Sequence, residues 1–284
     1  MSIIKYRLFN INRWIFIVTI LLGLFIFFFV SSGLFDVTIG FNSSALDISD
    51  NASSVQQKLI RQILTLDNYT DVLGFSSTVI PIMIFFSVTC FFDEINGLFI
   101  YEYNRVSNSK KLIIHTLLFY SFLNAVVVYI LYLIYFLIGY IFIGNNIEIP
   151  RNAFDGIFGA GFGNHAIYFI MEAIIPYFIG TLIYTFFACA VSFFVNHKYQ
   201  CILIPIIYYW GSYILIEFIR SFMTPQLASI FVKFQPMFIY GYQSYIYENP
   251  SILTVINVLD SLLLPLVIGI ILLIIKLKKG RDWC

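Results

Sequence analysis

The chain carries little charge: Asp, Glu, Lys and Arg make up 11% of its 284 residues. A soluble domain has about 25% charged residues, which help to keep its surface in water. The hydrophobic share of 60% and a mean hydropathy of +0.90 therefore exclude an ordinary water-soluble protein. The net charge of +1 indicates no polyanionic partner, so nucleic acid is not expected to bind.

Groups that could carry chemistry are also scarce. The four cysteines show no paired spacing, so the sequence predicts neither a disulfide nor a metal cluster, and we interpret them as small apolar side chains. His115, His165 and His197 are far apart along the chain and leave no set of metal ligands. The motifs His-Glu-x-x-His, Gly-x-Ser-x-Gly and Gly-x-x-x-x-Gly-Lys-Ser/Thr do not occur. The sequence predicts a protein that is not an enzyme and holds no metal or cofactor of its own.

Long apolar runs are what the chain has instead. A helix of about 20 residues crosses the hydrocarbon core of a bilayer, and six runs reach that length. They cover residues 14–35, 72–92, 112–143, 170–196, 199–219 and 251–275. The predicted fold is an all-α membrane protein with six transmembrane helices in a single domain over residues 1–284.

Lys and Arg are unevenly distributed between the predicted loops. An even number of spans places both termini on one side, which holds 11 of these residues against 5 on the other, together the 16 in the chain. The positive-inside rule therefore predicts a multi-pass protein of the cell membrane with both termini in the cytoplasm. Residues 36–71, 144–169 and 220–250 then form outer loops, and the spacing of Val55, Leu59, Ile63 and Leu66 predicts an amphipathic helix on the outer leaflet in the first. The abundance of Ile, Phe, Tyr and Asn indicates an AT-rich, bacterial genome.

The link between the second and third spans, residues 93–111, is rich in polar groups. Acidic residues open it and basic residues close it, which the dipole of a short cytoplasmic helix favours. Leu98, Tyr101 and Arg105 have the spacing of residues on one helix face. Such a helix would offer a partly apolar contact to a partner protein, and an ordinary solvated loop is the alternative.

This link resembles the coupling helix of type 2 permeases of ATP-binding cassette (ABC) transporters. The resemblance begins with the pattern acid-acid-x-x-Gly and ends with Arg-x-Ser and a Lys before the next span. The residues that it assigns to contact with an ATPase are Asp93, Glu94, Gly97, Leu98, Tyr101, Arg105, Ser107 and Lys110. The basic start of the chain is similar to the family's interfacial helix, and residues 220–250 look like its outer re-entrant hairpin. The outer loop over residues 36–71 is longer than in the smallest members.

The resemblance implies a division of labour between chains. This chain would be the transmembrane permease subunit of an ABC exporter, paired with itself or with a second permease in the lipid membrane. A separate ATPase subunit would bind ATP and Mg and hydrolyse the nucleotide. The aromatic and aliphatic spans favour an amphipathic or hydrophobic cargo, such as a peptide, a lipid-like molecule or a drug.

Polar residues near the outer ends of the spans have two interpretations. They either form local ion pairs or line the outer mouth of a transport path, and they are Glu172, Glu217, Arg220 and Asp260. Glu217 and Arg220 are three residues apart, so a local ion pair is the simpler interpretation. An ion-coupled secondary transporter is the alternative function, although such carriers place acidic residues nearer the midplane of the membrane.

Overall fold

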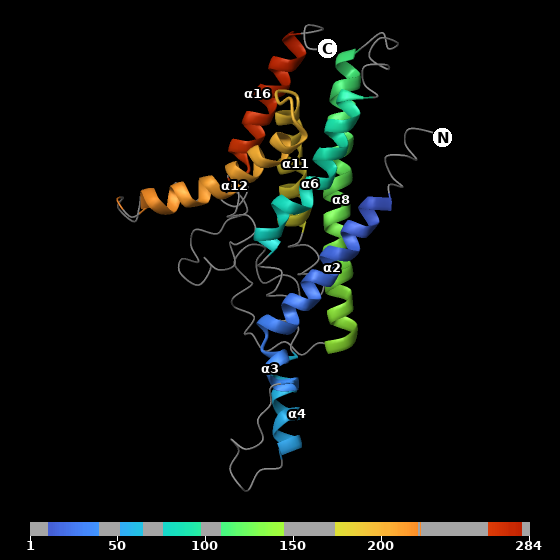
Figure 1. Ribbon diagram of the computed structural model, residues 1–284, viewed down its shortest axis with the longest axis vertical. Coiled ribbons are helices and arrows are strands. Elements are labelled where there is room, and N and C mark those ends of the chain that lie inside the picture. Colours follow the sequence, from blue (N-terminus) through green and yellow to red (C-terminus); the bar gives the residue numbers. More distant parts are fainter. Residues whose placement is uncertain are drawn as a thin grey trace, which may run out of the picture. The chain divides into compact units, whose positions relative to one another are not determined.

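The computed structural model describes residues 11–39, 52–64, 76–97, 109–144, 174–220, 222 and 261–279 (Figure 1). These residues form helices and short turns and contain no β-strand, which confirms the all-α class for this part of the chain. The helices are α2 (Ile11–Ser31), α3 (Leu34–Thr38), α4 (Ala52–Ile63), α6 (Ser76–Asn96), α8 (Ser109–Ile143), η4 (Ile174–Gly180), α11 (Thr181–Ser192), α12 (Lys198–Arg220) and α16 (Leu263–Lys279).

Two of the described helices are long and apolar enough to cross a membrane. They run over Lys110–Ile143 in α8, with 34 residues, and over Lys198–Ile219 in α12, with 22 residues. At 1.5 Å per residue, the α8 stretch is about 51 Å long and exceeds the hydrocarbon core of about 30 Å. By length and composition, these two helices suggest a membrane protein.

The chain divides into two compact units. The first consists of Met1–Ser76 and Leu131–Arg151, and the second of Ser77–Ile130 and Asn152–Cys284. The boundary between the units falls within α8, whose residues up to Ile130 belong to the second unit. Each unit is described below by itself.

In the first unit, α2 ends earlier than the apolar run that predicted it. Gly33 has a φ of 75°, a left-handed conformation that glycine adopts without steric cost and that ends the helix. The first predicted span, residues 14–35, is therefore wrong at its end, because hydropathy continues across a backbone break. The interfacial helix expected at the start of the chain lies outside the described residues up to residue 10, and residues 11–13 belong to α2.

The amphipathic helix expected in the first outer loop is present as α4. It packs on α3, and the side-chain amide Nε2 of Gln56 donates a hydrogen bond of 2.8 Å to the carbonyl oxygen of Val37. The aromatic rings of Phe25 and Tyr135 lie 5.4 Å apart in the same unit. The first contact joins α3 to α4, and the second joins α2 to the last part of α8.

In the second unit, α11 is the central helix. It packs most extensively on α16 and next on α12, and ten of its twelve residues are buried. The close approach to α16 occurs at Gly269, where an added Cβ would lie 2.8 Å from Cε1 of Phe186. Figure 1 shows α16 running beside α11, whereas α12 runs crosswise to both.

The fourth predicted span, residues 170–196, is not one regular α-helix. Its described part begins as the π-helix η4 and continues as α11, which ends before Phe193. Pro176 within η4 has no backbone N–H, so regular α-helical pairing cannot run through this segment unbroken. In α12, Pro205 also lies inside the helix, and its carbonyl oxygen accepts a hydrogen bond from the hydroxyl of Tyr184 on α11.

Candidate functional site at the end of α6

The acidic residues predicted to open a coupling helix belong to the last turn of α6. This helix runs to Asn96, and the N–H of Gly97 donates a hydrogen bond of 3.0 Å to the carbonyl oxygen of Asp93. The prediction of one helix over residues 93–111 is therefore wrong at both ends, because α8 already begins at Ser109. Backbone pairing continues past the apolar run, so the two flanking helices include the first and last residues of the link.

In the last turn of α6, the carboxylates of Asp93 and Glu94 need partners that offset their negative charge. The C-terminal end of a helix carries the negative end of its dipole and disfavours a nearby negative charge. Glu94 is only 6% exposed, and the hydroxyl of Tyr120 on α8 donates a hydrogen bond of 2.6 Å to its Oε2. A buried carboxylate needs such hydrogen bonds, because its removal from water is costly without them.

Asp93 has a partner from a distant part of the sequence. Its Oδ2 lies 2.5 Å from Nζ of Lys198, the first residue of α12, which follows it by 105 residues. Both side chains are about half exposed, at 56% for Asp93 and 50% for Lys198. Because solvent screens this ion pair, its main effect is to fix which groups are neighbours rather than to add much stability.

Phe193, directly after α11, joins these contacts to α16. Its ring meets the ring of Phe91 edge-on at 5.4 Å, and Nζ of Lys276 lies 5.7 Å from its ring centre, within cation–π range. Phe91 also contacts the ring of Tyr120 at 5.6 Å. The resulting group, here called the terminal cluster, consists of Phe91, Asp93, Glu94, Tyr120, Phe193, Lys198 and Lys276.

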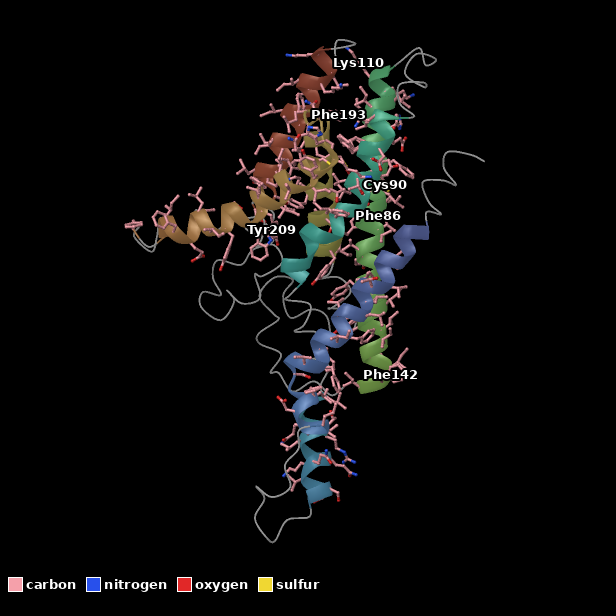
Figure 2. All side chains as sticks on the ribbon, viewed as in Figure 1. Phe86, Cys90, Lys110, Phe142, Phe193 and Tyr209 are labelled. Carbon is pink, nitrogen blue, oxygen red and sulfur yellow. The ribbon has the colours of Figure 1, made fainter. Side chains whose placement is uncertain are left out.

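Two further residues of the predicted coupling segment, Lys110 and Gly97, are described outside the terminal cluster. Lys110 is exposed in the first turn of α8, and Figure 2 shows it toward the same end of the helices as Phe193. Gly97 is exposed at the end of α6. Leu98, Tyr101, Arg105 and Ser107 lie outside the described residues.

Sequence reasoning singled out Asp93 and Glu94 but not their partners. In the sequence, Lys198 is one of the 11 bases on the predicted cytoplasmic side, and Tyr120, Phe193 and Lys276 lie in or next to apolar runs without a distinguishing pattern. Lys198 is one of many bases in the chain that could compensate the two acids. The structure selects it through the turn between α11 and α12.

The residues predicted for an outer mouth are only partly described. Glu217 is partly buried on α12, and Arg220 is the last residue of that helix. Glu172 and Asp260 lie outside the described residues. Within the described ranges, no three residues among His, Cys, Asp and Glu come together as a group that could hold a metal ion.

A second polar group, here called the buried network, lies inside the second unit. The hydroxyl of Ser87 on α6 donates to Oδ1 of Asn124 on α8, and Nδ2 of Asn124 donates to the hydroxyl of Thr185 on α11, both at 2.9 Å. All three residues are at most 4% exposed. The buried network thus joins three helices through neutral side chains that sequence reasoning did not identify.

No protein-family model, curated protein or solved structure matches this chain.

Proposed function

We propose that this chain is the transmembrane permease subunit of an ATP-driven ABC exporter. In this proposal it crosses the cell membrane six times, with both termini in the cytoplasm, and the six spans are those expected from the sequence. The observation that carries the proposal is the terminal cluster, which anchors the helices on both sides of residues 98–108. A partner that moves this short link would move helices of the permease.

The mechanical argument starts from the attachment of the link. Residues 98–108 are bounded by Gly97, at the end of α6, and by α8, which begins at Ser109. The hydrogen bond between Glu94 and Tyr120 ties these two helices together near the link. The ion pair between Asp93 and Lys198 extends the tie to the start of α12. A displacement of the link would therefore be transmitted to α6, α8 and α12.

Exposed apolar side chains support a membrane setting. Phe142 on α8 is 83% exposed and Ile214 on α12 is 64% exposed, and they belong to the two helices long enough to span a bilayer. In water such side chains would promote aggregation, whereas lipid covers them at no cost. The same apolar character favours an amphipathic or hydrophobic cargo, such as a peptide, a lipid-like molecule or a drug.

A permease of six spans would form half of a transport path. Pairing with itself or with a second permease would complete the path, and each half would bind one ATPase subunit that carries ATP and Mg. The proposed contact on this chain comprises Asp93, Gly97, Leu98, Tyr101, Arg105, Ser107 and Lys110. Glu94 is buried and would support this contact through its hydrogen bond to Tyr120 and not touch the ATPase itself. At the outer end, Glu172, Glu217, Arg220 and Asp260 would line the mouth of the path.

The first experiment asks whether an ATPase depends on the end of α6. The tagged full-length chain is purified from its native membranes in mild detergent, and vanadate-sensitive ATP hydrolysis is measured in the eluate. A co-purifying subunit is identified by peptides that contain a Gly-x-x-x-x-Gly-Lys-Ser/Thr motif. We expect Asp93→Arg to reduce co-purified ATPase activity at least tenfold. Asp36→Arg is the matched control, because Asp36 is an exposed acid of the first unit.

Two results would overturn the proposal. One is a purified wild-type chain without any ATP-binding subunit. The other is transport in vesicles that survives ATP depletion and collapses with a protonophore, which would favour the ion-coupled secondary transporter instead.

A separate experiment tests the six spans. In a variant whose native cysteines are replaced, single cysteines at Lys110, Lys278 and Lys58 are labelled with a membrane-impermeant maleimide. We expect the first two to react only from the cytoplasmic side and the third only from outside. Figure 1 shows α12 running crosswise to α11, so the side of the membrane on which α12 begins needs its own test. A single cysteine in place of Tyr199, the second residue of α12, reports that side. Labelling of Lys110 and Lys58 from the same side would contradict the topology.

A further inference from the structure

Thr181, the first residue of α11, has a buried hydroxyl that the described part of the chain does not satisfy. The residue is 0% exposed, and its Oγ1 has no hydrogen-bond partner among the described residues. An unsatisfied buried hydroxyl costs free energy, so native proteins commonly satisfy such a group with an ordered water molecule. The surroundings of Thr181 therefore show what could bind it.

The π-helix that precedes Thr181 explains why its hydroxyl has no partner among the described residues. Two other buried hydroxyls in the second unit donate to the carbonyl four residues earlier: Ser121 donates to Leu117 at 2.9 Å, and Ser192 to Ala188 at 3.0 Å. For Thr181 the corresponding carbonyl belongs to Tyr177, which lies in η4. Backbone pairing in a π-helix joins residues five apart, so this carbonyl is displaced from its usual α-helical position.

The next turn of α11 brings Thr181 close to the buried network. Thr185 follows it by four residues, so both side chains lie on the same face with their Cβ atoms about 5–6 Å apart. The hydroxyl of Thr181 makes no direct hydrogen bond to that of Thr185, because it has no partner among the described residues. One oxygen that forms a hydrogen bond of about 2.8 Å with each hydroxyl could join the two at this spacing. Thr185 already accepts a hydrogen bond from Nδ2 of Asn124, and its own O–H proton can serve a further acceptor.

We propose that one water molecule is bound between the hydroxyls of Thr181 and Thr185. The water accepts a hydrogen bond from the hydroxyl of Thr185 and donates one to the hydroxyl of Thr181. It thereby extends the buried network along α11 to the junction with η4. The donors and acceptors around it are neutral hydroxyls and an amide, which suit water better than an ion. The proposal is independent of the transport function, because it rests only on contacts inside the second unit.

The test deletes one hydroxyl at constant volume. Thr181→Val removes the hydroxyl and keeps the shape of the side chain, and the melting temperature of the purified full-length chain is compared with that of the wild type. A water-binding hydroxyl predicts a loss of about 2–4 °C, as expected for one hydrogen bond in a protein of this size. If no water is bound, the substitution removes only an unsatisfied group, and the melting temperature stays equal or rises.

A spectroscopic measurement identifies the water directly. Infrared difference spectra in H₂¹⁶O and H₂¹⁸O report the O–H stretch of bound water, and the spectrum of each variant is subtracted from that of the wild type. We expect an isotope-sensitive band that Thr181→Ser keeps and Thr181→Val loses. Thr89→Val is the matched control and keeps the band, because the hydroxyl of Thr89 donates to the carbonyl of Phe86 at 2.9 Å. An unchanged band in Thr181→Val, or a melting temperature at or above that of the wild type, overturns the proposal.

Discussion

The hydroxyl of Tyr120 donates a hydrogen bond of 2.6 Å to Oε2 of Glu94, at a point where both side chains are almost fully buried. The residues belong to α8 and to the last turn of α6, so the bond closes the pair of helices that flank the proposed coupling link. A hydrogen bond to a charged group is about twice as strong as one between neutral groups. It connects α6 and α8 directly, as the hydrogen bond between Ser87 and Asn124 also does.

Tyr120→Phe removes this hydrogen bond and leaves the ring in place. We expect the free energy of unfolding to fall by about 1.5–3 kcal/mol, because the buried carboxylate loses a donor. Thermal or denaturant unfolding of the chain in detergent measures the loss. Tyr199→Phe serves as the control, since Tyr199 is 59% exposed and its change should stay within about 0.5 kcal/mol. Equal stability of the two variants would contradict the role given to Tyr120.

The ion pair between Asp93 and Lys198 predicts an unusual response to exchange of its charges. Asp93 sits at the C-terminal end of α6 and Lys198 at the N-terminal end of α12, so each charge opposes the dipole of its own helix. Exchanging them preserves the attraction and makes both dipole interactions favourable. We expect Asp93→Lys with Lys198→Asp to be more stable than the wild type by about 0.5–1 kcal/mol.

The two single substitutions provide the comparison for this exchange. Each breaks the pair and places like charges side by side, but both sites are about half exposed, so each should cost at most about 1 kcal/mol. A double-mutant cycle of unfolding free energies gives the coupling between the sites. If the effect of the double exchange equals the sum of the two single effects, the coupling is zero and the two groups do not interact.

The apolar pattern predicted where helices lie but not where they end. Hydropathy reports which residues can contact lipid, whereas a helix ends where its backbone pairing stops. Gly33 ends α2 inside an apolar run, and Asp93 and Glu94 extend α6 beyond one. The helical spacing of Val55, Leu59 and Ile63 did predict α4, because that spacing reflects the geometry of the helix itself, whereas Leu66 of the same pattern lies outside the described residues.

Partners across the fold were harder to predict, because no rule links residues that are distant in the sequence. Many bases could have compensated Asp93, and only the folded chain selects Lys198. The buried network had a weak signal, since Asn124 is the one amide side chain between residues 112 and 143. A polar residue at such a depth needs a partner, but the sequence does not reveal that Ser87 and Thr185 supply it.

Gly269 determines how closely α16 approaches α11. An added Cβ would lie 2.8 Å from Cε1 of Phe186 and 3.3 Å from the Cα of Phe187, so Gly269→Ala forces the helices or the phenyl ring to shift. We expect a loss of about 1–3 kcal/mol in unfolding free energy, as for an overpacked core. Gly23→Ala in α2 is the control, because no atom lies within 4 Å of an added Cβ there. That change should raise stability by about 0.5–1 kcal/mol through helix propensity.

Tyr184 and Tyr208 face opposite consequences when their hydroxyls are removed. The hydroxyl of Tyr184 donates to the carbonyl oxygen of Pro205, so Tyr184→Phe should lower the free energy of unfolding by about 1 kcal/mol. The hydroxyl of Tyr208 is buried beside Phe187 and has no hydrogen-bond partner among the described residues. Tyr208→Phe should therefore leave stability unchanged or raise it by about 1 kcal/mol, because the neighbouring Phe187 ring offers no polar atom to hold a bridging water, in contrast to Thr185 next to Thr181. Unfolding of both variants in the same detergent measures the difference, and a larger loss for Tyr208→Phe than for Tyr184→Phe would reverse the assignment of the two hydroxyls.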